Sequence, residues 1–244
     1  MVGFKKMKIK KRLTTGFIMV SVITAIAAVI GCIAMVVVAN QYAKALDDYG
    51  FAQGDIGKAM VAFSDVRSAT RAAVGYDEEA SIKEAVAVHD EKKAEFKEYM
   101  EVIGGELINQ KEQEPYDNVM AILEQYWNID TTAISLGKSV DIEQSKEAQK
   151  MTAGQLDPMY DEIYGNLAAL MEVKINEGNS LSNTLKMLSI ILILAIVVII
   201  IAAILVSTKL GVNIANGIAG PMGALSERFK TFAKGDLSSS FPDS

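Results

Sequence analysis

Residues 188–206 read LSIILILAIVVIIIAAILV, and residues 17–39 read FIMVSVITAIAAVIGCIAMVVVA. These runs are 19 and 23 residues long, and neither contains a charged side chain. As a helix, each run is long enough to cross a hydrocarbon core of roughly 30 Å, and each is too long for the apolar part of a signal peptide. The sequence therefore predicts two transmembrane helices, over residues 13–39 and 186–207, which flank a domain at residues 40–185.

Charge predicts how the chain is oriented in the membrane. Residues 1–12 contain six basic side chains and no acidic one, whereas residues 40–185 contain 13 basic and 27 acidic ones, a net charge of 13 − 27 = −14. Because basic residues next to a span stay in the cytoplasm, we expect a cytoplasmic leader at residues 1–12 and an external domain at residues 40–185. The second span then returns residues 208–244 to the cytoplasm, as in a multi-pass protein of the inner (plasma) membrane.

The basic leader also bears on the partners of the chain. Its six basic residues are Lys5, Lys6, Lys8, Lys10, Lys11 and Arg12. A cluster of this kind can bind nucleic acid, but its position against a span favours attraction to anionic membrane lipid, at about 1 kcal/mol per residue. We therefore predict membrane lipid as a partner, and no nucleic acid.

Few residues are suited to catalysis or metal binding. Cys32, the only cysteine, lies inside the first apolar run, so the domain has no internal disulfide. His89 is the only histidine, so a histidine-based metal site or catalytic triad lacks its other members. We interpret His89 as a partly buried structural histidine. The sequence predicts no enzyme activity, no catalytic residue, no metal site and no cofactor.

Apolar residues in the domain recur at helical spacing, and no stretch alternates as a strand does. The predicted helices cover about 40–75, 81–103, 113–136 and 141 into the second span. Gly104 and Gly105 end the second helix, Pro115 lies in the first turn of the third, and Pro158 bends the fourth. The predicted fold is all-α. An extracytoplasmic antiparallel four-helix bundle stands between two transmembrane helices, and a short amphipathic helix follows.

Two arginines are the candidate binding residues. Arg67 falls in the middle of the apolar stripe of the first bundle helix and Arg71 falls at its edge, in a domain that otherwise uses lysine. A guanidinium in that position needs a partner, and a carboxylate fits its planar fork. One interpretation is an internal ion pair with Asp157, Asp161 or Glu162. The other is that Arg67 and Arg71 bind the carboxylate of a small external ligand.

The C-terminal tail carries a second pattern. Leu225, Phe229 and Phe232 recur at helical spacing after Pro221, and Gly235-Asp236-Leu237 follows them. This spacing predicts a short amphipathic helix over residues 221–234, which begins at Pro221 and stops at Gly235. Because so short a helix has no core of its own, we expect it to pack against the same segment of a second copy.

This arrangement resembles the methyl-accepting chemotaxis proteins of bacteria. Their N-terminal half contains a basic start, a span, a four-helix-bundle ligand-binding domain, a second span and a HAMP domain. Their amino-acid-sensing members carry an Arg-Ser-Ala-x-Arg run that binds ligand carboxylates across a dimer interface, and this chain has Arg67-Ser68-Ala69-Thr70-Arg71. The resemblance therefore implies a ligand-binding role for Arg67 and Arg71. A further arginine of the family is replaced by Ala62, which removes one contact for a dicarboxylate.

The tail is similar to the first helix of a HAMP domain. The resemblance places Pro221, Leu225, Phe229, Gly235, Asp236 and Leu237 in signalling. It implies a homodimeric chemoreceptor that senses a small molecule and passes a helix displacement inward, to a kinase and an adaptor bound by a further cytoplasmic part. The alternative is that the chain is the sensory half of a HAMP-containing histidine kinase or nucleotide cyclase. In either case we expect residues 208–244 to be a partial HAMP domain.

Overall fold

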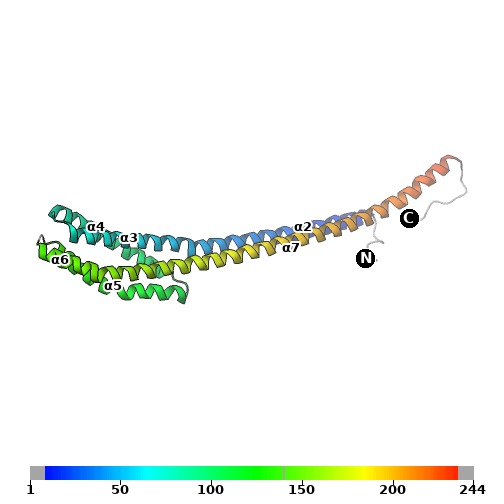
Figure 1. Cartoon of the computed structure of the whole chain (residues 1–244). Helices are drawn as coiled ribbons and strands as arrows, with labels where there is room; N and C mark the ends of the chain where they lie inside the picture. The colour runs from blue at the N-terminus through cyan, green and yellow to red at the C-terminus, as the bar shows by residue number, and fades with distance from the viewer. Residues whose placement is uncertain (1–8, 140, 236–244) are drawn as a thin grey trace. The chain divides into compact units, whose positions relative to one another are not determined.

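The computed structural model describes residues 9–139 and 141–235, which are helical apart from short connections (Figure 1). The elements in chain order are α2 (Ile9–Ala45), the π-helix η1 (Leu46–Phe51), α3 (Ala52–Gly75), α4 (Glu79–Gly105), α5 (Gln110–Gly137), α6 (Ile142–Met151), the π-helix η2 (Thr152–Leu156) and α7 (Asp157–Ala233). The described residues contain no strand. The predicted all-α fold is confirmed.

The chain divides into two compact units. We call residues 40–185 the bundle unit, and we call the described residues of 1–39 and 186–244 the apolar unit. In the bundle unit α3 packs along α4 and α5 packs along α6, and connections of a few residues make each pair antiparallel.

Aromatic rings from all four bundle helices meet at the centre of the bundle unit. The ring of Phe63 on α3 lies 4.8 Å from Phe96 on α4, 5.1 Å from Tyr126 on α5 and 5.1 Å from Tyr160 on α7, measured between ring centroids. Such pairs stabilise by about 0.5–1.5 kcal/mol beyond the area that they bury. Phe63 is therefore the residue on which the four helices converge.

The ends of the bundle helices follow from local hydrogen bonding. Asn109 accepts hydrogen bonds from the backbone N–H groups of Lys111 and Glu112, and this cap starts α5 at Gln110. The prediction that Pro115 lies in the first turn was therefore wrong, because the cap starts the helix three residues earlier than expected and leaves the proline inside it. The predicted end of the second helix is confirmed, since α4 ends at Gly105.

A glycine permits a close contact where α5 ends. A Cβ atom on Gly137 would lie 2.9 Å from Cα of Val74 and 3.0 Å from the carbonyl oxygen of Ala73. Backbone atoms cannot move aside as the end of a flexible side chain can. Gly137 thus lets the end of α5 approach the last turn of α3 more closely than any other residue would.

Two π-helices interrupt the long helices of the bundle unit. η1 separates α2 from α3, and η2 separates α6 from α7. We predicted a bend at Pro158, but the irregular turn lies just before it, at Thr152–Leu156. Proline has no N–H to donate to the carbonyl four residues back, which here belongs to Gly154, so the wider turn lies where the regular ladder is broken.

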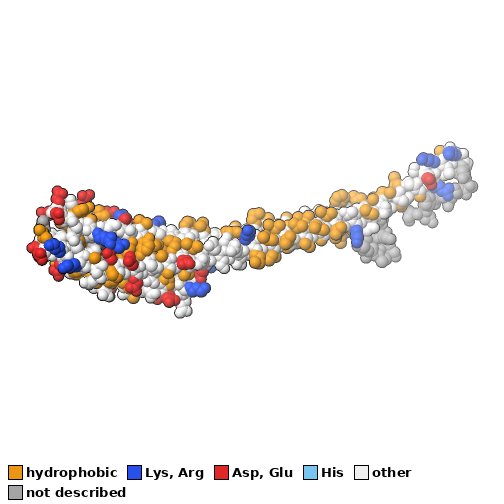
Figure 2. Space-filling view, viewed as in Figure 1, with side chains coloured by type: hydrophobic (Ala, Val, Ile, Leu, Met, Phe, Trp, Pro, Cys, Tyr) orange, Lys and Arg blue, Asp and Glu red, His pale blue; other side chains and the backbone are white. Residues whose placement is uncertain are grey.

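The apolar unit contains the parts of α2 and α7 that correspond to the two apolar runs. Their long aliphatic side chains point outward and cover the surface of these two stretches, whereas charged side chains lie on the bundle unit and near the C-terminal end of α7 (Figure 2). Within the apolar unit, a Cβ atom on Gly16 would lie 2.9 Å from Cδ1 of Ile214. Among the described residues, two helical stretches, within Leu13–Gly75 and Ile142–Ala233, are long and apolar enough to cross a membrane.

The tail differs from the prediction. α7 runs without interruption through Pro221 to Ala233, so no separate helix begins at Pro221. Gly220, which would cap a helix that begins at Pro221, has no side-chain oxygen to accept hydrogen bonds from the first N–H groups, and the helix instead continues through the proline with one backbone donor fewer and a clash of its ring with the carbonyl four residues back. Gly235 follows the helix with φ of +86°, a conformation that favours glycine and stops the helix. Leu225 and Phe229 lie on α7, whereas Asp236 and Leu237 lie outside the described residues.

Candidate functional site

Arg67 and Arg71 lie one turn apart on α3, and both contact the carboxylate of Asp157 on α7. Nε and Nη2 of Arg67 each lie 3.1 Å from Oδ1 of Asp157, and Nη2 of Arg71 lies 2.7 Å from its Oδ2. The carboxylate thus lies between two guanidinium groups. The internal ion pair with Asp157, one of the two interpretations from the sequence, is present.

The two arginines differ in how they are held. The guanidinium of Arg67 lies over the ring of Tyr160, 4.1 Å from its centroid, and the Arg67 side chain is 27% exposed. The Arg71 side chain is 50% exposed. Arg67 is therefore fixed by an aromatic face and a carboxylate, whereas Arg71 has a free side toward solvent.

Charge and exposure together define what these three residues can bind. Two guanidinium groups and one carboxylate carry a net charge of +1, inside a domain whose net charge is −14. An anion that reaches Arg71 from solvent can use the fork of donors that Asp157 leaves open. We call Arg67, Arg71 and Asp157 the arginine site. Its two guanidinium groups can bind a carboxylate or a similar small anion.

The backbone next to the arginine site is irregular. η2 ends at Leu156, directly before Asp157. π-helical turns occur often at functional sites, because the extra residue can be taken up or released in a change of helix register. α7 therefore begins at the site itself, directly after a π-helical turn.

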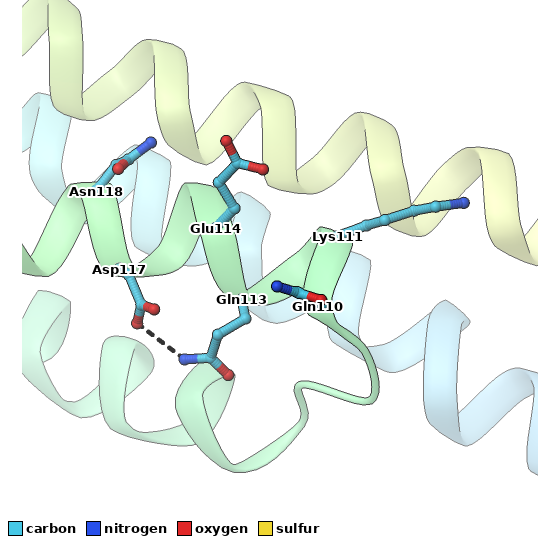
Figure 3. A pocket seen from close by; sticks show the side chains of 6 residues that line it. All are labelled: Gln110, Lys111, Gln113, Glu114, Asp117 and Asn118. Carbon is cyan, nitrogen blue, oxygen red and sulfur yellow. Dashed lines mark hydrogen bonds between the residues drawn. The ribbon is translucent and has the colours of Figure 1, made fainter.

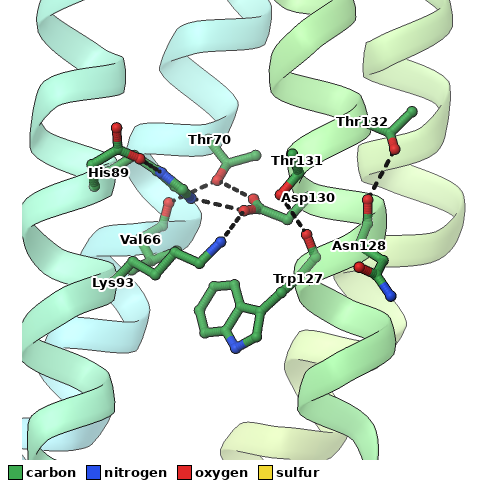
Figure 4. A network of polar contacts seen from close by, with 10 residues as sticks. Val66, Thr70, His89, Lys93, Trp127, Asn128, Asp130, Thr131 and Thr132 are labelled. Carbon is green, nitrogen blue, oxygen red and sulfur yellow. Dashed lines mark hydrogen bonds and ion pairs between the residues drawn. The ribbon is translucent and has the colours of Figure 1, made fainter.

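A second polar cluster is buried deeper in the bundle unit, around Asp130 on α5 (Figure 4). Oδ1 of Asp130 accepts a hydrogen bond of 2.7 Å from the hydroxyl of Thr70, and Oδ2 lies 2.8 Å from Nε2 of His89 and 3.8 Å from Nζ of Lys93. Lys93 also lies over the ring of Trp127. We call Thr70, His89, Lys93 and Asp130 the aspartate cluster. It joins α3, α4 and α5.

A buried ion pair holds the opposite end of the bundle, where the chain enters and leaves it. Nζ of Lys174 on α7 lies 2.9 Å from Oε2 of Glu112 on α5, and these side chains are 1% and 0% exposed. The same ammonium donates to the carbonyl oxygens of Asp48 in η1 and of Glu106. Lys174 thus satisfies a carbonyl of the π-helix, where the regular pattern of helical hydrogen bonds is interrupted.

The surface hollows of the bundle unit are less specific candidate binding sites than the arginine site. Two of them have volumes of about 540 and 580 Å³. Figure 3 shows that the first is lined by side chains from the start of α5, where Gln113 donates a hydrogen bond to Asp117. Their lining is polar and carries both signs of charge, so neither hollow presents a single anchor for a ligand.

The structure thus brings the two predicted binding residues together at one site, and it adds residues that were not predicted. Asp130, Lys174 and Glu112 were missed. Lys174 could have been noticed, because it continues the apolar stripe of Ile163, Leu167 and Leu170 at helical spacing, as Asp130 continues that of Leu123 and Tyr126. A charged residue on a buried stripe signals a buried partner.

The comparisons with known proteins identify the sensory domain. The family model described as "Four helix bundle sensory module for signal transduction" matches residues 6–187. The match includes the whole bundle unit and the first apolar run. No curated protein and no solved structure matches the chain.

Proposed function

The chain belongs to the family of four-helix-bundle sensory modules for signal transduction, and we propose that it is the sensory and transmembrane half of a bacterial chemoreceptor of the methyl-accepting type. The proposal places the bundle unit outside the cell and the leader and tail in the cytoplasm. Two candidate membrane spans and the basic leader support this arrangement. The role is sensory rather than catalytic.

The arginine site is the proposed place of ligand recognition. Its ligand is a small molecule with a carboxylate, such as an amino acid or an organic acid, which contacts Arg71 and Arg67. The observation that supports this proposal is the convergence of both guanidinium groups on Asp157, because they already hold one carboxylate, that of Asp157, between them.

The signal is proposed to arise by competition with Asp157. A ligand carboxylate that binds the two arginines weakens their hold on Asp157, the first residue of α7. Because α7 continues through the second apolar run to Ala233, a small shift at its start displaces the helix toward the proposed HAMP segment at Pro221, Leu225 and Phe229. A kinase and an adaptor would then respond through a further cytoplasmic part.

We propose that two copies act together as a homodimer. Apolar side chains that a single bundle leaves exposed, among them Leu46 and Val61, support this pairing. A dimer would also bring a second copy close to the exposed side of Arg71, where the ligand is expected to bind.

The proposal is tested by ligand-induced stabilisation of the full chain in lipid nanodiscs, screened with the amino acids and with short mono- and dicarboxylic acids. At least one of these should raise the melting temperature. For that compound, Arg67→Ala is expected to weaken binding by about tenfold or more, because a charge-assisted contact is lost. The exposed lysine Lys83 provides the matched control, and Lys83→Ala should leave the affinity unchanged.

Substitution of Asp157 should raise the affinity for the ligand, whereas Arg67→Ala should lower it. Asp157→Asn removes the internal competitor while it keeps the shape of the side chain, so the same compound should bind more tightly than it binds the unchanged chain. If Arg67→Ala and Lys83→Ala behave alike, the arginines serve only as an internal ion pair, and the ligand binds elsewhere.

A further inference from the structure

His89 lies in an unusual position for the only histidine of the chain. It belongs to the core-facing side of α4, and its side chain is 3% exposed. Both ring nitrogens contact carboxylates: Nε2 lies 2.8 Å from Oδ2 of Asp130, and Nδ1 lies 2.9 Å from Oδ1 of Asp90. Asp130 is fully buried, whereas Asp90 is exposed.

The two contacts of His89 bear on its protonation. An ionised carboxylate can only accept a hydrogen bond, and a neutral imidazole carries only one N–H. When both carboxylates are ionised, two contacts of hydrogen-bond length are satisfied together only if each ring nitrogen carries a proton, that is, if His89 is an imidazolium ion. The hydroxyl of Thr70 on α3 contributes a further donor to Asp130 at 2.7 Å.

The groups around His89 act on its pKa in both directions. Burial alone lowers the pKa of His89, but the hydrogen bond and the charge of Asp130 and the hydrogen bond to Asp90 raise it above its ordinary value of 6.5. Lys93, on the same helix, opposes them through its own charge. From α5, Tyr126 also faces Asp130, and burial together with that charge raises the pKa of the phenol, so the phenol stays neutral.

We propose that His89 and Asp130 form a proton-binding site in the bundle core, through which the bundle unit senses alkaline conditions as a second input besides a small molecule. The bound proton joins α4 to α5, and Asp130 joins both to α3 through Thr70. When the proton leaves, the ring loses its positive charge, and one ring nitrogen turns its lone pair toward the carboxylate that it faces, Asp130 or Asp90. This input is independent of recognition at the arginine site.

The direction of the effect follows from linkage. Because the pKa of His89 is raised in the folded state, its stabilising contribution is complete below about pH 6.5, the value for an unfolded chain. The contribution is lost as the pH rises through the higher pKa of the folded state. The packing of α4 against α3 and α5 should therefore loosen on the alkaline side and tighten on the acidic side.

A single histidine makes the titration directly measurable. The full chain, labelled with ¹³C and ¹⁵N in histidine and held in lipid nanodiscs, gives one imidazole signal, which is followed by NMR from about pH 5 to about pH 9. The proposal predicts a midpoint above 6.5 and ¹⁵N shifts of an imidazolium ion below that midpoint. A midpoint at or below 6.5 would overturn the proposal, whatever ligand the arginine site binds.

Two aspartate variants show which carboxylate raises the pKa of His89. Asp130→Asn should bring the midpoint below 6.5, because burial then acts without the opposing carboxylate. Asp90→Asn, at the exposed contact, should lower it by less. Equal midpoints in the unchanged chain and in Asp130→Asn would contradict the pairing, and the unchanged chain alone decides the question if Asp130→Asn does not fold.

Thermal unfolding of the full chain tests whether proton binding at His89 changes the stability of the bundle. The melting temperature of the unchanged chain should fall as the pH rises through the NMR midpoint, and His89→Gln should remove that fall. If His89→Gln follows the same pH profile as the unchanged chain, proton binding does not control the packing of the bundle and the proposal fails.

Discussion

Lys174→Ala is expected to lower the free energy of unfolding of the bundle unit by about 3–5 kcal/mol, because it leaves the carboxylate of Glu112 buried without a partner. Both side chains are almost fully buried, and they lie 2.9 Å apart. The variant also removes the donor of the Asp48 and Glu106 carbonyl oxygens. The loss of unfolding free energy is large because the variant leaves buried polar groups without partners, whereas exposed ion pairs contribute far less.

Trp127 provides the measurement. It is the only tryptophan of the chain, and its ring packs against Phe63 and Phe96 in the bundle core, so its fluorescence reports on the bundle unit during urea unfolding of the full chain in detergent. Lys146→Ala is the matched control, because this exposed lysine lies 4.0 Å from Glu143, and it should leave the transition unchanged. Similar transitions for both variants would show that the Lys174–Glu112 pair does not hold the bundle.

Phe63→Ala is expected to lower the free energy of unfolding by about 3–5 kcal/mol as well, through the loss of buried area and the cavity that remains. Phe63 is completely buried and contacts rings from the other three bundle helices. The surrounding side chains are rigid rings, and rigid rings collapse poorly into a cavity. The effect should therefore lie toward the upper part of that range.

A phenylalanine on the surface provides the comparison. Phe51, in η1, is 57% exposed, so Phe51→Ala should change the free energy of unfolding by much less than Phe63→Ala. Far-UV circular dichroism during urea unfolding is the appropriate signal, because Phe63 touches Trp127 and its removal would alter the fluorescence itself. Equal losses in the two variants would contradict the placement of Phe63 at the centre of the core.

The helices of this chain could be predicted because the apolar spacing and the stop signals are local. Gly105 ends α4 as the sequence indicates, and the apolar stripes of α3 and α5 face the core. The two π-helices could not be predicted, because an extra residue in a turn is stabilised by tertiary contacts, such as that of Lys174 with the Asp48 carbonyl. The continuity of α7 through Pro221 was missed because proline more often begins a helix than lies within one.

The candidate site was predictable in its residues and not in its geometry. Arg67 and Arg71 stand out by residue type and by position on a stripe, but their common partner depends on how α3 and α7 align along the bundle. Asp157, Asp161 and Glu162 were equivalent in the sequence, and only the packed structure selects Asp157. The aspartate cluster escaped notice for the same reason, since Thr70, His89 and Asp130 lie on three different helices.

In the proposed topology the chain crosses a membrane twice and holds the acidic bundle unit outside the cell. Single cysteines at Gly105 and at Lys10, each in a Cys32→Ser background, place a thiol at the tip of a bundle connection and at the start of α2, two positions that are exposed to solvent. The measurement is labelling of intact cells with a membrane-impermeant maleimide. With this topology the cysteine at position 105 reacts at once, and the cysteine at position 10 reacts only after the membrane is opened. Labelling at position 10 and protection at position 105 in intact cells would contradict it.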